Sequence, residues 1–391
     1  MTYKLRDYQQ KASDAAVSFF NNKAKKTNAI MVLPTGSGKS LIISDIAARL
    51  DGHTLVFQPS KEILEQNYLK LCSYGVLDCS IYSASFGRKE VSRITFATIG
   101  SVINHPELFQ HFKNIIIDEC HLVNPKEGMY KSFLSMLKCK VLGLTATPYR
   151  LSSSRDFGSM LKFITRTRPC VFSEVIYQVQ ISTLLDMGYL AKLNYYAMNP
   201  IGWNELNLKV NTTGADYTDK SVTMEYERID FYGYLVHIVQ RLVNNTVTGS
   251  KRKGILVFTR FLKESERLTW SIPGTAIVSG DTPKKERERI LEAFKAGEIP
   301  VVANVGVLTT GFDYPELDTI VMARPTMPLA LWYQIVGRAI RPHPNKEAGW
   351  IVDLCGNIKR FGEVKDLRLV DGGNGKWAVY SGYRQLTNVR F

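Results

Sequence analysis

The sequence predicts an α/β protein of two tandem domains, each a mostly parallel sheet flanked by helices. Two stretches of the chain repeat one order, in which short strands rich in β-branched residues alternate with segments of helical periodicity. These strands are continuous apolar runs instead of alternating ones, as is typical of strands covered on both faces. A length of 391 residues also exceeds what one ordinary hydrophobic core encloses. We therefore expect two α/β domains and a short C-terminal tail.

Ten strands are expected, five in each stretch. The strands of the first stretch cover residues 29–33, 54–57, 94–97, 114–117 and 141–144. Those of the second stretch cover residues 255–258, 276–279, 301–304, 319–323 and 350–354. Right-handed crossovers bring the carboxyl ends of parallel strands to one edge, where functional loops are expected. The expected bounds are 1–190 for the first domain, 191–362 for a connector with the second domain, and 363–391 for the tail.

The segments outside these strands carry weaker signals. Residues 149–253 are less regular and contain the turn-rich stretch NTTGADYTDK at 211–220. A helix is expected there whose apolar face is formed by Leu235, Ile238, Val239 and Leu242. In the tail, DGGNGKW predicts a hairpin turn between two short strands.

The composition is that of a globular protein with a basic surface. The formal net charge of +14 favours a polyanionic partner such as nucleic acid, although solubility alone is the alternative. The six cysteines form no CxxC pair, which argues against a zinc module or a disulfide framework. No apolar run is long enough to span a bilayer, and residues 1–10 lack the pattern of a signal peptide. We expect a cytoplasmic protein without a membrane partner, either nucleoid-associated or phage-encoded in a bacterial cytosol.

The string LPTGSGKS at 33–40 has the residues of a phosphate-binding loop. Such a loop needs main-chain N–H groups that converge on oxygens, glycines where side chains would obstruct, and a helix N-terminus behind them. Leu33 stands where the strict pattern has its first glycine, so the string alone leaves a plain glycine-rich turn open. We expect Lys39 to reach the β and γ phosphates and Ser40 to hold Mg²⁺, and the full expected nucleotide-binding set of the loop is Thr35, Gly36, Ser37, Gly38, Lys39 and Ser40.

The string IIIDECH at 115–121 is an apolar strand that ends in two adjacent carboxylates and a histidine. We expect Asp118 to organise Mg²⁺ and Glu119 to orient and deprotonate an attacking water. Cys120 has no assignable partner base, so we expect a small packing residue there. His121 is expected to couple the site to the second domain, and an ordinary surface or core histidine is the alternative.

The string QIVGRAIR at 334–341 supplies two arginines far downstream. Arg338 and Arg341 are spaced i and i+3 and are expected to share one helical face. An arginine from a second domain stabilises charge on a transferring phosphoryl group and makes hydrolysis depend on domain closure. A solvated basic face is the alternative for an isolated RxxR, and the neighbouring Gln334 and Gly337 argue against it. The three strings supply the parts for nucleoside triphosphate hydrolysis, and the expected catalytic residues are Lys39, Asp118, Glu119, Gln334, Arg338 and Arg341.

In their order along the chain, these strings resemble the motifs of the superfamily-two helicases and translocases. LRDYQQ resembles the adenine-binding motif, with Gln9 at its glutamine position, and LTATPYR resembles the coupling motif, with Thr145 and Thr147 at its polar positions. QPSKEILEQN, FATIGSV, GILVFTR, VSGDTP and VLTTGFDYP resemble further motifs in the expected order. The resemblance implies two RecA-like P-loop domains. It also implies nucleotide contacts at Gly311 and Asp313 and nucleic-acid contacts at Ser60, Thr98, Gly100 and Thr309.

Within this superfamily the chain is most similar to the bacterial RadD-like DNA repair helicases. The strings LRDYQQKA, LPTGSGKSLII, SGDTP, NVGVLTTGFD, QIVGRAIRP and DLCGN carry that resemblance. Larger members of the group continue into cysteine-rich zinc modules, which we do not expect here because the chain has no CxxC. Ile335 stands where many relatives carry arginine, so only Arg338 and Arg341 are expected to act as arginine fingers.

The resemblance implies a helicase or translocase that depends on ATP and Mg²⁺ and acts on DNA in repair, replication or recombination. The expected partner is single- or double-stranded DNA, bound independently of sequence. An RNA helicase, the motor subunit of a restriction or defence complex, and a non-hydrolysing nucleic-acid clamp are the alternatives. Residues 314–333 leave little room for a strand-separating hairpin, so such an element is expected in the middle segment, in the tail or on a partner.

Overall fold

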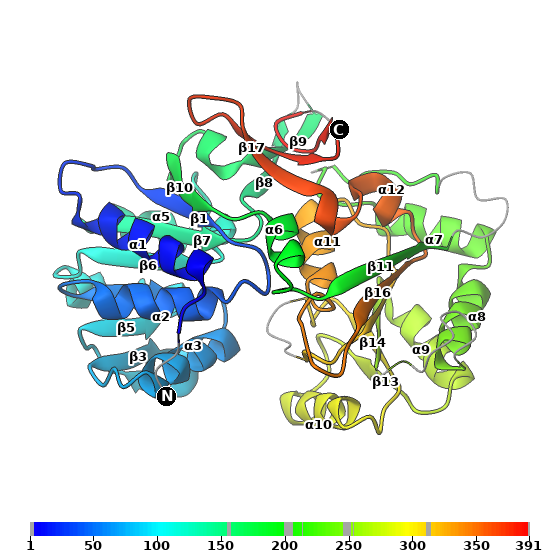
Figure 1. The fold of residues 1–391 in the computed structure, drawn as a ribbon. Coiled ribbons are helices and arrows are strands. Elements are labelled where there is room, and N and C mark those ends of the chain that lie inside the picture. The colour runs from blue at the N-terminus through cyan, green and yellow to red at the C-terminus, as the bar shows by residue number, and fades with distance from the viewer. Residues whose placement is uncertain are drawn as a thin grey trace.

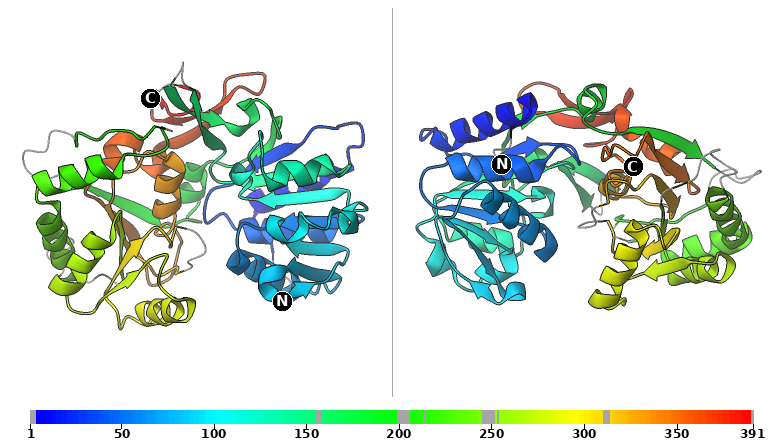
Figure 2. Two further views of the ribbon diagram at one scale, coloured as in Figure 1. Left: turned by 180° about the vertical axis from the view of Figure 1, so that it is seen from behind. Right: turned by 60° about the horizontal axis from the view of Figure 1, so that its bottom comes forward.

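The structure contains two α/β domains that lie side by side, as the sequence predicted (Figure 1). The structure, a computed structural model, describes residues 4–154, 158–198, 206–212, 214–244, 252, 254–309 and 314–389. The same two halves are separate in the two further views (Figure 2). None of the described helices is long and apolar enough to cross a membrane.

The first domain is built on a sheet in which eight strands are described, in the order β10-β1-β7-β6-β2-β5-β3-β4. All neighbouring strands are parallel except β3 and β4. All five predicted strands are confirmed, whereas β3, β4 and β10 were not predicted. The strands are β1 Ala29–Val32, β2 Thr54–Phe57, β3 Cys79–Ser83, β4 Arg88–Lys89, β5 Ile94–Ala97, β6 Asn114–Asp118, β7 Lys140–Thr145 and β10 Glu174–Gln178. The helices are α1 Asp7–Asn21, α2 Lys39–Arg49, α3 Lys61–Ser73, α4 Ile99–Val102 and α5 Met129–Ser135.

Helices α1, α2 and α3 cover one face of this sheet because each has an apolar side. Ala12, Ile43 and Leu64, one from each helix, are fully buried in one cluster with Met31 and Val56 of the sheet. The opposite face of the sheet is buried against a second cluster, so the central strands are covered on both sides. This double burial explains why the sequence shows continuous apolar runs.

The second domain is built on a parallel sheet in which six strands are described, in the order β11-β16-β15-β12-β14-β13. The predicted strands and the predicted apolar face of α8 are confirmed, and all four residues of that face are buried. The strands are β11 Lys192–Ala197, β12 Ile255–Thr259, β13 Thr275–Val278, β14 Val301–Val305, β15 Thr319–Ala323 and β16 Ala348–Asp353. The helices are α7 Asp219–Arg228, α8 Phe231–Val243, α9 Leu262–Ser271, α10 Lys284–Lys295, α11 Leu329–Val336 and α12 Asn357–Phe361.

The segments between and after the two sheets form smaller elements. A hairpin of β8 Tyr149–Ser154 and β9 Gly158–Phe163 lies between β7 and β10 of the first domain, and α6 Ile181–Asp186 lies between β10 and β11. The predicted tail hairpin is confirmed, as β17 Leu367–Asp371 pairs with β18 Trp377–Ser381, and β19 Arg384–Gln385 is added to it. Short 3₁₀ helices complete the described chain, at Ala84–Phe86, Pro106–Phe109, Cys120–Leu122, Ile164–Arg166 and Val364–Asp366.

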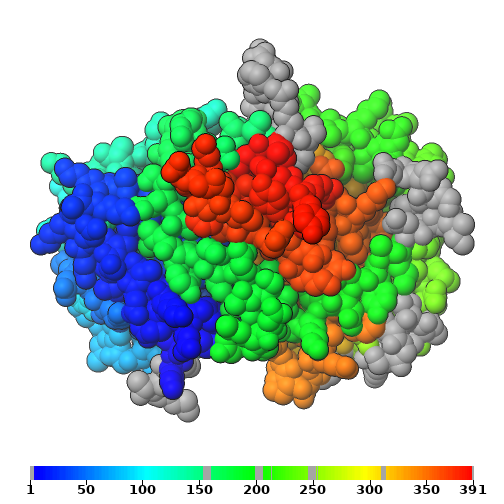
Figure 3. Space-filling view, turned by 45° about the horizontal axis from the view of Figure 1, so that its top comes forward, coloured from blue at the N-terminus to red at the C-terminus, as the bar shows by residue number. Residues whose placement is uncertain are grey.

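The tail returns from the second domain to pack on the first. The Gln180 side chain donates to the Leu369 carbonyl oxygen at 2.7 Å, and the Asn388 N–H donates to the Leu161 carbonyl oxygen at 2.6 Å. In the space-filling view the tail occupies the centre of the face between the two domains (Figure 3). The chain passes from the first sheet to the second between β10 and β11. The division at residues 190 and 362 stays a prediction.

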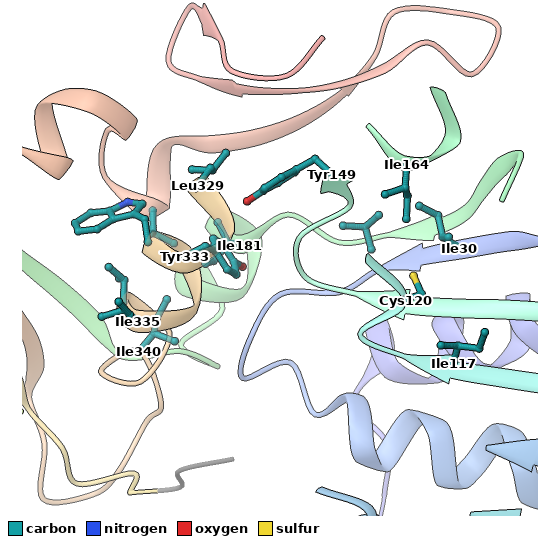
Figure 4. Packing of buried hydrophobic residues seen from close by; sticks show 14 of the residues in the cluster. Ile30, Ile117, Cys120, Tyr149, Ile164, Ile181, Leu329, Tyr333, Ile335 and Ile340 are labelled. Atoms are coloured by element: carbon teal, nitrogen blue, oxygen red, sulfur yellow. The ribbon is translucent and has the colours of Figure 1, made fainter. Parts of the chain in front are cut away.

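One hydrophobic cluster continues from the first domain into the second. Tyr149, just after β7, points toward Leu329 and Tyr333 of α11, while Ile117 and Cys120 lie deeper in the first domain (Figure 4). Cys120 is buried in this cluster, as expected for a packing residue. Apolar contact across the domain boundary holds α11, and the loop that follows it, next to the first sheet.

Candidate nucleotide-binding site

The phosphate loop follows β1 directly and leads into α2. Gly36 and Gly38 have φ angles of +82° and +81°, a left-handed conformation that favours glycine. A Cβ at Gly36 would lie 2.8 Å from Leu190 Cδ2, and one at Gly38 would lie 2.6 Å from Gln9 Nε2. Both glycines are therefore favoured by conformation, and a Cβ at either would displace the end of the Leu190 or Gln9 side chain. The helix begins at Lys39, so its N-terminus faces the cradle, as phosphate binding needs.

The two carboxylates follow β6 in very different electrostatic surroundings. Burial, with the charge of Glu119 beside it, raises the pKa of Asp118 to about 7. Burial alone would raise the pKa of Glu119 too, but Lys39 and His121 outweigh it and lower that pKa to about 2. Lys39 Nζ lies 3.5 Å from Glu119 Oε1, and His121 Nδ1 lies 3.3 Å from Glu119 Oε2. Glu119 is thus held ionised, as a general base must be.

The structure also brings the three predicted coupling residues together. His121 Nδ1 lies 2.9 Å from Thr145 Oγ1 and 3.1 Å from Thr147 Oγ1. Thr147 N–H donates to Thr145 Oγ1 at 3.0 Å. The same imidazole contacts Glu119, so one side chain joins the carboxylate site to the loop after β7. Their coupling role stays a prediction.

The second domain contributes the loop that follows α11. The prediction that Arg338 and Arg341 share a helical face is wrong, because α11 ends at Val336 and both arginines lie in the turns beyond it. The N–H groups of Arg338 and Ala339 bond three residues back instead of four, which tightens the last turn and ends the helix. A Cβ at Gly337 would lie 2.8 Å from Thr35 Cγ2, so the turn packs directly on the phosphate loop.

Both arginines nevertheless face the first domain. The Arg338 guanidinium donates to the Thr309 carbonyl oxygen. Burial lowers the pKa of Arg338 to about 10, against the opposing charge of Glu119, and burial lowers that of Arg341 as well. Charges removed from water in this way interact more strongly with a negative ligand.

A single cleft of about 660 Å³ joins the two sets of residues. Its walls include Thr35, Gly36, Gly38, Lys39, Ser40, Asp118, Glu119 and His121 from the first domain and Thr309, Gln334, Arg338 and Arg341 from the second. The glycine cradle, a hydroxyl and a carboxylate fit a nucleoside triphosphate with Mg²⁺, which is commonly bound by one or two protein oxygens and the phosphates. Ser40 and Asp118 would hold the metal, and Lys39 and Ser37 would lie against the phosphates.

Gln9 approaches the same loop from α1. Its Nε2 donates to the Ser37 carbonyl oxygen at 2.9 Å, and the Tyr8 hydroxyl donates to that oxygen at 2.7 Å. The Tyr8 and Tyr189 rings lie 5.7 Å apart, and the Arg6 guanidinium stacks on Tyr189. Sequence reasoning missed both tyrosines. Tyr8, next to Gln9, could have been noticed, whereas only the fold brings Tyr189 to this loop.

The remaining predicted residues lie at loops of the same sheet edges. Ser60 caps α3, its Oγ accepting from Ile63 N–H at 3.4 Å, and Thr98 Oγ1 lies 2.9 Å from Ser101 Oγ. A Cβ at Gly100 would meet nothing within 4 Å. These residues and Thr309 stay predicted nucleic-acid contacts, and Thr309 is placed in the nucleotide cleft. Gly311 and Asp313 lie outside the described residues.

Comparison with known families agrees with this arrangement. Residues 2–150 match the family described as Type III restriction enzyme, res subunit. Residues 235–343 match the family described as Helicase conserved C-terminal domain. These matches fall on the two sheets whose loops form opposite walls of the cleft. Each half of the chain thus matches a helicase domain of superfamily two. Its two helicase domains support the expected enzyme class, a nucleic-acid-dependent ATPase.

The relatives of this chain are distant in sequence. It is 25% identical over 388 residues to IRC3 of Saccharomyces cerevisiae, provisionally named an ATP-dependent helicase, covering 90% of this chain and 51% of that protein. It is 26% identical over 379 residues to the DNA 3'-5' translocase XPB2 of Sulfurisphaera tokodaii, covering 88% and 80%. The chain spans 51% of the length of IRC3 and 66% and 47% of the lengths of two further relatives. The ATP-dependent Type ISP restriction-modification enzyme LlaBIII, solved bound to DNA, shares the fold at a TM-score of 0.65 and 19% identity, covering 90% of this chain and 28% of that one.

The raised pKa of Asp118 predicts a pH-dependent Mg²⁺ affinity. A metal ligand must be deprotonated, so protons compete with Mg²⁺ as the pH falls through about 7. We expect the Mg²⁺ affinity of the nucleotide complex, relative to that of Asp118→Asn, to fall about tenfold between about pH 8 and pH 6. The terminal phosphate of ATP also titrates in this pH range. Its contribution is the same in the Asp118→Asn variant, so the comparison with that variant removes it. Mg²⁺ titrations of a fluorescent ATP analogue measure both proteins, and a ratio that does not change with pH would contradict the prediction.

Proposed function

We propose that this chain is a DNA translocase or helicase that couples hydrolysis of Mg-ATP to movement along the nucleic-acid backbone. The observation that supports this best is the single cleft whose one wall carries Lys39, Asp118 and Glu119 and whose other wall carries Arg338 and Arg341. A protein that only bound nucleic acid would not need an ionised carboxylate faced by a buried arginine, Arg338, and a half-buried one, Arg341. This argues against a non-hydrolysing clamp.

The residues of the cleft divide the chemistry between the two domains. Lys39 and the loop amides hold the phosphates, and bound Mg²⁺ would neutralise charge that develops on them. Glu119, ionised by its contacts with Lys39 and His121, accepts a proton from the attacking water. Arg338 and Arg341 stabilise the transferring phosphoryl group from the second domain, with Gln334 beside them in the cleft.

Hydrolysis then changes the position of one domain relative to the other. This in turn changes the contacts that the protein makes with a nucleic-acid strand. The His121, Thr145 and Thr147 cluster joins Glu119 to the loop at the carboxyl end of β7. Ser60, Thr98 and Gly100 follow β2 and β5 at the same edge of the sheet. Backbone amides and hydroxyls at such positions suit phosphate contacts, which do not depend on base sequence. Closure and opening of the cleft would therefore move the protein along its strand.

The names of relatives favour DNA over RNA as the track. The XPB2 relative is named a DNA translocase, and the LlaBIII structure contains DNA. RNA stays the alternative, since a Dbp5 structure with a TM-score of 0.57 is bound to RNA. A RadD-like role in DNA repair and a cytoplasmic site of action rest on the sequence motifs. The restriction-enzyme family match and the similar fold of an HsdR fragment of a type I restriction enzyme, at a TM-score of 0.66, support a second candidate, the motor of a restriction complex.

ATP turnover with different nucleic acids tests the proposal. We expect turnover to rise with single- or double-stranded DNA, regardless of base sequence, and binding to weaken steeply with added salt because phosphate contacts release counterions. Matched single-stranded, duplex, forked and RNA molecules would be compared in one assay. ATP turnover that is the same in the absence and in the presence of each nucleic acid would contradict the proposal. Stimulation by RNA alone would favour the RNA helicase instead.

A further inference from the structure

A basic pocket lies beyond the carboxyl ends of β6 and β7, apart from the nucleotide cleft. It has a volume of about 270 Å³. The hairpin β8–β9 forms one side, and it lies at the top of the molecule, where β9 contacts β18 of the tail (Figure 1). We call it the hairpin pocket and define it by its described lining residues, Asn124, Pro125, Lys126, Arg150, Leu151, Ser152, Lys162, Thr167 and Arg168.

The charge in the hairpin pocket is of one sign. Four cationic side chains line it, and none of the described lining residues carries a carboxylate. Arg150 is half-buried, and burial lowers its pKa with no described acidic group to offset the effect. Arg150 and Lys162 are half-buried while Lys126 and Arg168 are exposed, and all four line one concave site. Such a site is suited to an anion with several oxygens, and Ser152 and Thr167 add hydroxyl groups.

Arg150 also connects the pocket with the nucleotide site. Its Nη1 donates to the His121 carbonyl oxygen at 2.9 Å. The His121 ring contacts Glu119, and the Glu119 carboxylate contacts Lys39. An anion that pulls on the Arg150 guanidinium therefore acts on the main chain two residues from the general base. No other lining residue has a described hydrogen bond to this segment.

We propose that the hairpin pocket binds a phosphodiester of the nucleic-acid track and that Arg150 reports its presence to the carboxylate site. The proposal rests on the proposed function, because it names part of the surface on which the track would lie. The ligand chemistry is a phosphate oxygen anion, which free phosphate could also supply. The position of the pocket favours the track, since β7 and β6 are followed in the sheet by β2 and β5, whose loops carry Ser60 and Thr98.

The decisive experiment compares two double variants with equal loss of charge. Lys126→Ala with Lys162→Ala removes two cations from the pocket. Lys113→Ala with Lys138→Ala is the matched control, because both lysines are exposed and precede β6 and β7 at the opposite edge of the same sheet. Anisotropy of a labelled single-stranded oligodeoxynucleotide would give the affinity at several salt concentrations, and thermal unfolding would check each fold.

We expect the pocket variant to flatten the slope of log affinity against log salt by about 1.4, since each lost phosphate contact removes about 0.7 for a single strand. The control should change the slope much less, because charges farther than about 10 Å are screened at about 0.1 M salt. Equal losses in both variants would overturn the proposal. Arg168→Ala, on the exposed loop after β9, gives a smaller shift in the same direction and guards against a fold effect of the double variant.

Two further experiments test whether the pocket binds free phosphate or the nucleic-acid backbone, and whether Arg150 transmits that binding to the carboxylate site. If only inhibition by inorganic phosphate changes in the pocket variant, the site binds free phosphate and the proposal for the track is overturned. Arg150→Lys keeps the charge but loses the fork that bonds His121, so we expect it to retain the salt slope and lose most stimulation of turnover by DNA. Full stimulation in Arg150→Lys would overturn the reporting role. A parent protein that neither binds DNA nor responds to it would instead refute the proposed function.

Discussion

Glu119→Gln is expected to bind nucleotide normally and to hydrolyse it at least about a hundredfold more slowly, the range for loss of a general base being about 10²–10⁴. The substitution keeps the size and hydrogen-bonding reach of the side chain that Lys39 and His121 contact. It removes the negative charge and the basicity, and little else. Nucleotide affinity should stay close to that of the parent, because the phosphate cradle is unchanged.

The measurement needs binding and turnover on the same preparations. Glu127→Gln is the matched control, since this glutamate is exposed in the loop after the same strand. Lys39→Ala provides a contrast, because loss of the phosphate-bound charge should weaken nucleotide binding as well as turnover. Turnover in Glu119→Gln within a few-fold of the parent would show that another group takes the proton.

Most of the first and second sheets could be predicted because their strands are buried on both faces. Residues such as those of β6 and β12 form uninterrupted apolar runs, which leave one interpretation. β10 and β11 were missed because their residues are only partly buried and their sequences mix polar with apolar side chains. Those two strands lie at edges of the two sheets, where only one neighbour constrains them.

The site could be predicted as a set of residues but not as a geometry. Short sequence motifs identified Lys39, Glu119 and Arg338. The spacing of residues within each motif reflects the local requirements of a loop or a strand end. The end of α11 at Val336 could not be predicted from the RxxR spacing, since it depends on how Gly337 packs against Thr35 of the other domain. Contacts made across a domain boundary leave no local pattern in the sequence.

Arg341→Ala is expected to retain nucleotide binding and to lose turnover by about 10³–10⁵, the range for an arginine that stabilises the transferring phosphoryl group. Arg341 lies on the second domain and lines the cleft opposite Lys39. Its interaction should be strongest with charge that develops in the transition state, so kcat should fall while nucleotide affinity changes little. Arg289→Ala is the control, because that arginine is exposed on α10 of the same domain.

Arg338 has a described structural contact as well, because its guanidinium donates to the Thr309 carbonyl oxygen. Arg338→Ala leaves that oxygen without this donor, so we expect a lower unfolding temperature together with lost turnover. Measuring turnover and unfolding temperature in each variant therefore separates the chemical from the structural contribution of that arginine.

Arg341→Lys decides whether charge alone is enough. An ammonium keeps the positive charge but cannot reproduce the planar fork that bonds two phosphate oxygens together, so rescue should be poor. Full rescue would mean that the cleft needs only a positive field from the second domain, and unaffected turnover in Arg341→Ala would remove Arg341 from the chemistry. A large loss of turnover in both Arg341→Ala and Arg341→Lys, with nucleotide binding intact, would mean that the second domain must reach the nucleotide held by the first. Hydrolysis would then occur only in the closed arrangement, which is the condition for coupling ATP to movement.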